Sequence, residues 1–189
     1  MTYLNTRNVV AIALCAALWG VLNSTFAPLF FSITHLPFFC DLIGFSVLTL
    51  AAWWIRKFGT ISIIGALATV INFALVPSAV HFLGFTIASV FFDLAISIVG
   101  FNKPFGKKAY TVASIMPISI SSAALAGYLI GTFFMSGPAL APTGGVLGWA
   151  GMHAIGGIIG GAIGISLVIG LDARKVTVRR SEYKQMLPN

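Results

Sequence analysis

Polar side chains that could bind a small molecule recur near one end of several apolar stretches of this 189-residue chain. They are all three histidines, two asparagines, an aspartate, a tyrosine and a tryptophan: Asn23, His35, Asp41, Asn72, His81, Tyr128, Trp149 and His153. Individually, His and Trp suit a membrane interface, and Asn can cap a helix. Together, amide and aromatic groups suit a small heteroaromatic ligand. The sequence therefore predicts a ligand-binding cavity, roofed by loops at residues 28–31 and 138–145.

Some of the same residues could also serve in catalysis or in metal binding. Asp41 with His35 and His153 could perform acid–base chemistry, and three histidines with one aspartate could hold a divalent metal. These residues come from four separate segments, without the regular spacing of a metal-binding motif. We therefore predict a binding site with no resident metal, no cofactor and no catalytic residue.

Asp93 is a separate candidate because it lies inside an apolar stretch, one helical turn from Ser89 and from Ser97. An ionisable side chain inside a membrane-spanning helix is costly unless it faces protein or water. Asp93 is therefore either a functional carboxyl or a buried structural one that accepts hydrogen bonds from nearby hydroxyls. The sequence leaves both interpretations open.

The elements that must position these residues are apolar helices. Hydrophobic residues make up 58% of the chain and charged residues 8%, a composition that excludes an ordinary soluble domain. Because a hydrocarbon core needs about 20 apolar residues per helix, the sequence predicts an all-α membrane protein with six transmembrane helices in one compact bundle. This single membrane domain occupies residues 1–189, with spans at about 9–27, 36–55, 59–76, 82–100, 109–135 and 149–171.

The eleven Lys and Arg residues predict how this bundle is oriented. They precede the first stretch, follow the second, fourth and sixth, and are absent from the other three connections. Since short basic loops stay in the cytoplasm, both termini, the loop Lys103–Lys108 and the basic tail at 172–189 are predicted to be cytoplasmic. The net charge of +7 then indicates contact with anionic lipid of the bilayer rather than with nucleic acid.

Small residues line two of the predicted helices. The first carries Ala13, Ala16, Ala17, Gly20 and Ser24 at helical spacing, and the last carries Gly156, Gly160 and Gly164. Such faces allow close approach of a neighbouring helix. In the first helix that neighbour is either another helix of this chain or a partner membrane protein. Cys15 and Cys40 are interpreted as packing residues.

In topology the whole chain resembles the substrate-binding S-components of energy-coupling factor (ECF) transporters. The resemblance rests on six spans with both ends inside, on Ala13 and Ala17 as an AxxxA pattern, on a hydrophobic first outer loop and on a Gly-rich last helix. It implies high-affinity binding of a vitamin or related micronutrient at the cell membrane, without enzymatic activity. It also implies that Ala13 and Ala17 dock on a transmembrane coupling subunit, while cytoplasmic ATPase subunits supply energy.

Three alternatives stay open from the sequence. A divalent-metal-specific S-component is one, although this chain begins Met1-Thr2 and not with the Met-His of those members. A self-contained carrier or channel would use the glycine face of the last helix for self-association. A small intramembrane enzyme would use Asp41 with His35 and His153.

Overall fold

In the computed structural model, which describes residues 4–174 and 176, all regular structure is helical. The prediction of an all-helical bundle is therefore confirmed for this part of the chain, while residues 177–189 of the predicted basic tail lie outside it. The elements are α1 (Thr6–Thr34), α2 (Phe38–Ile55), α3 (Thr60–Leu75), α4 (Phe82–Val99), α5 (Lys108–Phe133), α6 (Gly137–Leu140), the 3-10 helix η1 (Ala141–Thr143) and α7 (Gly145–Ala173).

Local sequence explains where several helices begin. The Asn5 side chain accepts a hydrogen bond of 2.9 Å from the backbone N–H of Asn8 and so caps α1. Two glycines with positive φ, Gly144 at 84° and Gly145 at 80°, turn the chain into α7. As a result α7 begins four residues before the predicted boundary at 149.

Five described helices, α1, α2, α4, α5 and α7, are long and apolar enough to cross a membrane. Helix α3 is equally apolar but has 16 residues. At about 1.5 Å per residue it spans roughly 24 Å, less than a hydrocarbon core of about 30 Å. The bundle thus has the character of a multi-pass membrane protein, with five clear spans and a shorter helix where the sequence predicts the third.

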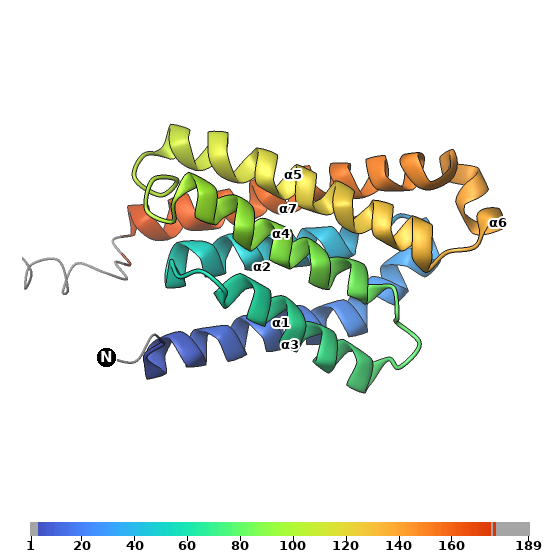
Figure 1. The fold of residues 1–189 in the computed structure, drawn as a ribbon, viewed down its shortest axis with the longest axis horizontal. Helices are drawn as coiled ribbons and strands as arrows, with labels where there is room; N and C mark the ends of the chain where they lie inside the picture. Colours follow the sequence, from blue (N-terminus) through green and yellow to red (C-terminus); the bar gives the residue numbers. More distant parts are fainter. Residues whose placement is uncertain (1–3, 175, 177–189) are drawn as a thin grey trace, which may run out of the picture.

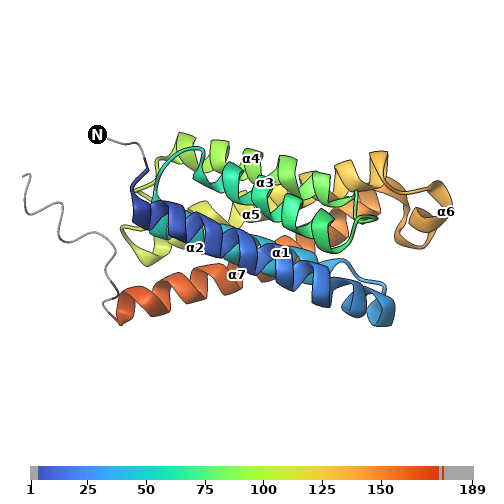
Figure 2. The ribbon, with the colours of Figure 1, turned by 90° about the horizontal axis from the view of Figure 1, so that it is seen from below.

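The long helices run alternately in opposite directions, so that the start of α1 and the end of α7 lie at the same end of the bundle (Figure 1). The α1–α2 and α3–α4 connections and α6 lie at the other end. Helix α7 packs against α2 and α5, and α1 packs against α2 and α3 (Figure 2). We call the end that carries α6 the distal end.

The predicted loop at residues 28–35 is wrong, because α1 continues through Pro28 to Thr34. Pro28 has no N–H to donate to the Ser24 carbonyl, yet the helix is not interrupted there. The chain leaves the helix at His35, whose φ of 56° is left-handed. The distal end of the bundle is therefore bordered by about two additional helical turns rather than by a loop.

Glycines of α7 allow the close helix packing that the sequence predicts. A Cβ atom added at Gly160 would lie 2.5 Å from the backbone oxygen of Asp41, and one at Gly157 would lie 2.6 Å from the Cβ of Ala123. Ser46 of α2 also donates a hydrogen bond of 3.0 Å to the Gly160 carbonyl. Because both neighbouring helices approach within the space of a methyl group, the prediction of close packing is confirmed.

The small residues of α1 divide between two directions. Ala16 is fully buried, and Gly20 packs against Ile71 and Ala68 of α3. Ala13 is exposed and Ala17 is half-buried. The stripe predicted as one face therefore serves packing inside the bundle through Ala16 and Gly20, while Ala13 and Ala17 remain towards its outer surface.

Candidate ligand-binding cavity

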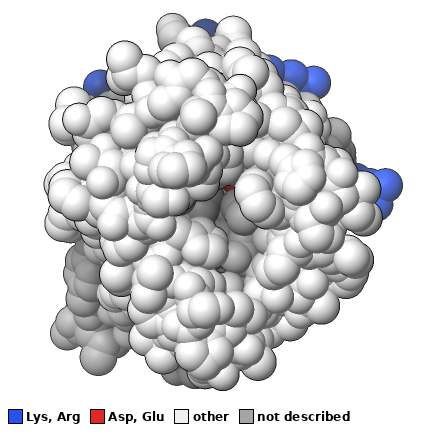
Figure 3. Space-filling view, turned by 90° about the vertical axis from the view of Figure 1, so that its right-hand side faces the viewer, with Lys and Arg blue, Asp and Glu red and all other residues white. Residues whose placement is uncertain are grey.

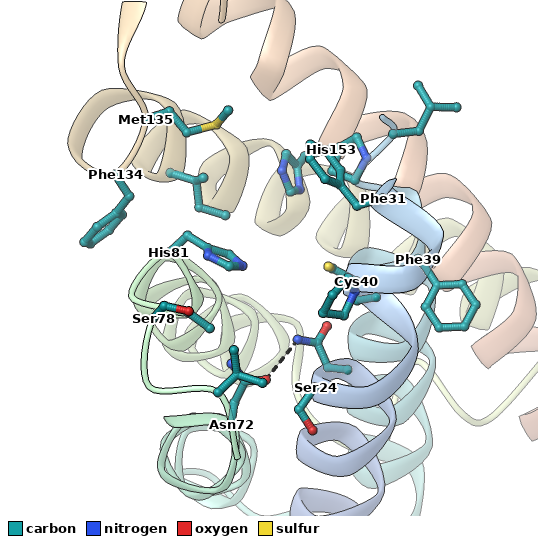
Figure 4. Close-up of a pocket in the computed structure, with 18 of the residues that line it drawn as sticks. Ser24, Phe31, Phe39, Cys40, Asn72, Ser78, His81, Phe134, Met135 and His153 are labelled. Atoms are coloured by element: carbon teal, nitrogen blue, oxygen red, sulfur yellow. Dashed lines mark hydrogen bonds between the residues drawn. The ribbon is translucent and has the colours of Figure 1, made fainter. Parts of the chain in front are cut away.

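A cavity of about 400 Å³ opens at the distal end. Seen from that end, the face has a central hollow with acidic atoms at its floor, and no Lys or Arg borders the hollow on the face drawn (Figure 3). The lining comes from α1, α2, α3, α5, α7 and the connection between α3 and α4. Its labelled side chains surround the space from several helices (Figure 4).

The structure brings most of the predicted ligand-binding residues together here. Asn23, Asn72, His81, Trp149 and His153 line the cavity. They come from four different elements separated by up to 130 residues, so the fold itself assembles them.

Two asparagine side chains meet in the cavity wall. Asn23 of α1 donates a hydrogen bond of 3.2 Å from Nδ2 to Oδ1 of Asn72 on α3, drawn as the dashed line in Figure 4. Both residues are buried, and within the described structure Asn23 Oδ1 and Asn72 Nδ2 have no hydrogen-bond partner. An unpaired buried amide group is costly, so a water molecule or a ligand is expected to satisfy this pair.

Asp41 does not line the cavity but contacts it through His153. The Nδ1 atom of His153 lies 3.1 Å from Oδ1 and 2.9 Å from Oδ2 of Asp41, and only the contact with Oδ1 has the angles of a hydrogen bond. An ionised carboxylate can only accept, so Nδ1 donates. This contact orients the ring and leaves Nε2 of His153 without a partner among the described residues.

Glycines on two helices make room for this Asp41–His153 pair. A Cβ atom at Gly156 of α7 would lie 2.5 Å from Oδ2 of Asp41, and one at Gly127 of α5 would lie 2.7 Å from the His153 side chain. Neither neighbour can retreat easily, because both side chains are buried. The two glycines are therefore part of the site, a role that the sequence pattern alone did not distinguish from helix packing.

Aromatic rings form the remaining wall. Trp149 contacts His153 edge-on at 5.4 Å between ring centroids and Phe31 at 6.3 Å, and Phe85 packs on the other side of His153 at 5.6 Å. The indole Nε1 of Trp149 has no acceptor within the described part of the chain. The cavity therefore has apolar ring surfaces together with a small set of unpaired polar atoms, as ligand pockets commonly do.

Besides Asp41, two predicted residues lie outside the cavity lining. His35 is the residue that ends α1, and its ring contacts Phe31 edge-on at 6.0 Å. Tyr128 is 46% exposed on α5, because its neighbour Gly127 is the residue that faces His153. The register of α5 thus directs the tyrosine to the surface of the bundle.

Several lining residues were not predicted from the sequence: Phe39, Cys40, Ser78, Phe134 and Met135. Phe31 was predicted as part of a roof loop, but it lies on α1, where Asn23, Ala27 and Phe31 are four residues apart and therefore share a helix face. Recognising it required a helix that continues past Pro28. Cys15 and Cys40 are both free thiols.

Asp93 lies far from the cavity and caps another helix. Its Oδ2 atom accepts hydrogen bonds from the Ser62 backbone N–H at 3.0 Å and from the Ser62 hydroxyl at 2.8 Å. Ser62 belongs to the first turn of α3, and its N-cap residue Gly59 has no side chain to do this. A carboxylate at a helix N-terminus is favourable, so the geometry assigns Asp93 a structural role.

His81, just before α4, lines the cavity and is partly buried. Burial lowers the pKa of His81 below its usual 6.5. Its imidazole is therefore uncharged at neutral pH.

Among the described residues, no group of three His, Cys, Asp or Glu side chains could hold a metal ion.

No protein-family model, curated protein or solved structure matches this chain. Function is therefore inferred from the cavity and from the sequence.

Proposed function

We propose that this protein is the substrate-binding membrane subunit of an uptake system and that the distal cavity captures a small heteroaromatic micronutrient. It would lie in the cell membrane with its basic loops and both termini in the cytoplasm, so that the cavity faces outward. Transport energy would come from a separate coupling subunit with ATPases, as in ECF transporters. The protein itself would catalyse no reaction.

The observation that carries this proposal is the set of unpaired polar atoms on the buried cavity wall. Asn23, Asn72, Trp149 and His153 each present one such atom within the described structure. Burial of unpaired polar groups costs free energy unless another molecule pairs with them. A cavity of about 400 Å³ is also within the size range of small-molecule sites.

Capture of a small molecule tests the proposal directly. The protein, purified in mild detergent, is incubated with a small-molecule extract of cells, washed and denatured, and the released compounds are identified by mass spectrometry. We expect a retained compound with the wild type and at least about tenfold less with His153→Ala or Asp41→Ala, because a buried polar contact is worth over about 1.4 kcal/mol. Tyr128→Phe, outside the lining, is the matched control. Absence of any retained compound would contradict the proposal.

Docking on a coupling subunit is a second, separable part of the proposal. Ala13 and Ala17 lie towards the outer surface of α1, where a second membrane protein could approach closely. Ala13→Leu should prevent co-purification of a partner while small-molecule capture is retained. Val10→Leu adds a methylene group at a neighbouring exposed position and serves as the control. Loss of both properties in Ala13→Leu would mean that this position packs within the bundle.

A further inference from the structure

The hydrogen-bonding capacity of the Asn23–Asn72 pair is independent of how each amide is oriented. A single hydrogen bond between two primary amides uses one NH₂ group and one carbonyl. It leaves one carbonyl and the other NH₂ group, here Asn23 Oδ1 and Asn72 Nδ2, both unpaired in the described structure. The wall contributed by α1 and α3 therefore presents an acceptor close to a donor.

The residues that line the cavity provide no fixed charge for a charged ligand, because the Asp41 carboxylate lies behind His153, with which it is paired. No Lys, Arg, Asp or Glu lies among the described residues that line it. His81 is uncharged at neutral pH, and His153 is already paired with Asp41. Because burial of an unpaired charge costs far more than burial of a neutral polar group, the lining disfavours an anion or a permanent cation.

The opposite wall adds further polar atoms and flat surfaces. Trp149 Nε1 is a donor, and Nε2 of His153 is an acceptor when Nδ1 donates to Asp41; neither has a partner within the described part of the chain. The rings of Phe31, Phe39 and Phe134 also line the cavity. Aromatic side chains bind planar rings by offset stacking or edge contacts.

On this basis, and resting on the proposed function, we infer that the cavity selects an uncharged planar heterocycle that carries a hydrogen-bond donor beside an acceptor. The edge of a primary carboxamide or a lactam has this arrangement. Its N–H donates to Asn23 Oδ1 and its carbonyl accepts from Asn72 Nδ2, while the ring lies among the aromatic side chains and within reach of Trp149 and His153. Asn23 and Asn72 then determine specificity.

Four pyridine probes of similar size separate charge from hydrogen-bonding pattern. Pyridine-3-carboxamide is neutral and has the donor–acceptor edge. Pyridine-3-carboxylate is an anion, and the 1-methylpyridinium form of the carboxamide is a cation. The methyl ester of pyridine-3-carboxylic acid is neutral and keeps the carbonyl but has no donor. Each is titrated against the wild-type protein in micelles by saturation-transfer NMR, with empty micelles as the blank.

We expect the carboxamide to bind at least tenfold more tightly than each of the other three probes. Asn72→Leu should weaken carboxamide binding at least tenfold, whereas Tyr128→Phe should leave it unchanged. The ester comparison uses wild-type protein and therefore does not depend on the folding of a variant. Equal or tighter binding of the anion, the cation or the ester overturns the inference.

Failure of all four probes to bind also overturns it. The extract-capture experiment keeps this outcome distinct from failure of the proposed function. Capture of a charged compound, together with no carboxamide binding, would refute the inference and leave the uptake role supported. A protein that captures nothing from the extract would refute the uptake role.

Discussion

Removal of the Asp93 carboxylate should release the N-terminal turn of α3. Asp93 accepts two hydrogen bonds from Ser62 and is fully buried, so bulk water cannot replace them readily. A hydrogen bond to a charged group contributes about 1.5–3 kcal/mol. Asp93→Ala should therefore lower the free energy of unfolding by at least ~3 kcal/mol. Asp93→Asn keeps an acceptor and loses mainly the interaction with the helix dipole, worth about 1 kcal/mol.

The assay is reversible unfolding in mixed micelles, with helix content followed by circular dichroism as the fraction of SDS rises. Ser97→Ala is the matched control, because Ser97 lies one turn further along α4, is half-buried and donates a hydrogen bond within its own helix, to the Leu94 carbonyl. It should change the free energy by less than about 0.5 kcal/mol.

Two results would refute this reasoning. If the free energy of unfolding of Asp93→Ala lies within about 0.5 kcal/mol of the wild-type value, the hydrogen bonds from Ser62 to Asp93 contribute nothing to stability. Loss of small-molecule capture by Asp93→Asn, at unchanged stability, would instead give Asp93 a functional role. We expect capture to be retained, because Asp93 lies twelve residues, or about 18 Å along α4, from His81 at the cavity.

Three further predictions concern packing, pH and topology. Gly160→Ala should lower the free energy of unfolding by about 1–3 kcal/mol in the same assay, because the added Cβ would lie 2.5 Å from the Asp41 backbone oxygen. Gly151→Ala is the control and should leave the free energy unchanged, because a Cβ there meets nothing within 4 Å among the described residues. The pKa of His81 in the folded state is lowered from 6.5, so the unfolded chain takes up a proton first as the pH falls. The free energy of unfolding should therefore decline below about pH 6.5, and it should decline less in His81→Gln. Unfolding measured between about pH 5 and 8 tests this. A cysteine introduced at Ser136 should react with a membrane-impermeant reagent added from outside the cell, and labelling from the cytoplasmic side alone would overturn the proposed orientation.

The helices could be predicted from the sequence because apolar length is a strong signal. All six predicted stretches are helical in the structure. Their observed boundaries differ most from the predicted ones near proline and glycine residues. Pro28 suggested the end of the first helix, but a proline removes one backbone hydrogen bond and a long helix can tolerate that loss. The glycines at 144 and 145 set the beginning of α7 through their positive φ, which composition does not reveal.

The cavity residues were predictable in part, since polar side chains at one level of several helices must find partners there. Which way each side chain faces was not, because it depends on helix register. Tyr128 faces outward since Gly127 occupies the inward position against His153. The capping role of Asp93 could not be predicted either, because the carboxylate and the N-terminus that it caps belong to different helices.

The length of α3 has a consequence for the surrounding lipid. Its 16 residues reach roughly 24 Å, about 6 Å less than the hydrocarbon core, and Ile63, Leu67 and Val70 on it are exposed. Hydrophobic mismatch of this kind costs a fraction of a kcal/mol per Å. The bilayer should therefore thin beside α3, while α1 and α7, with 29 residues each, tilt to fit. Lipids with shorter acyl chains should accumulate along α3, so the annular lipid around this protein would differ from one side of the bundle to the other.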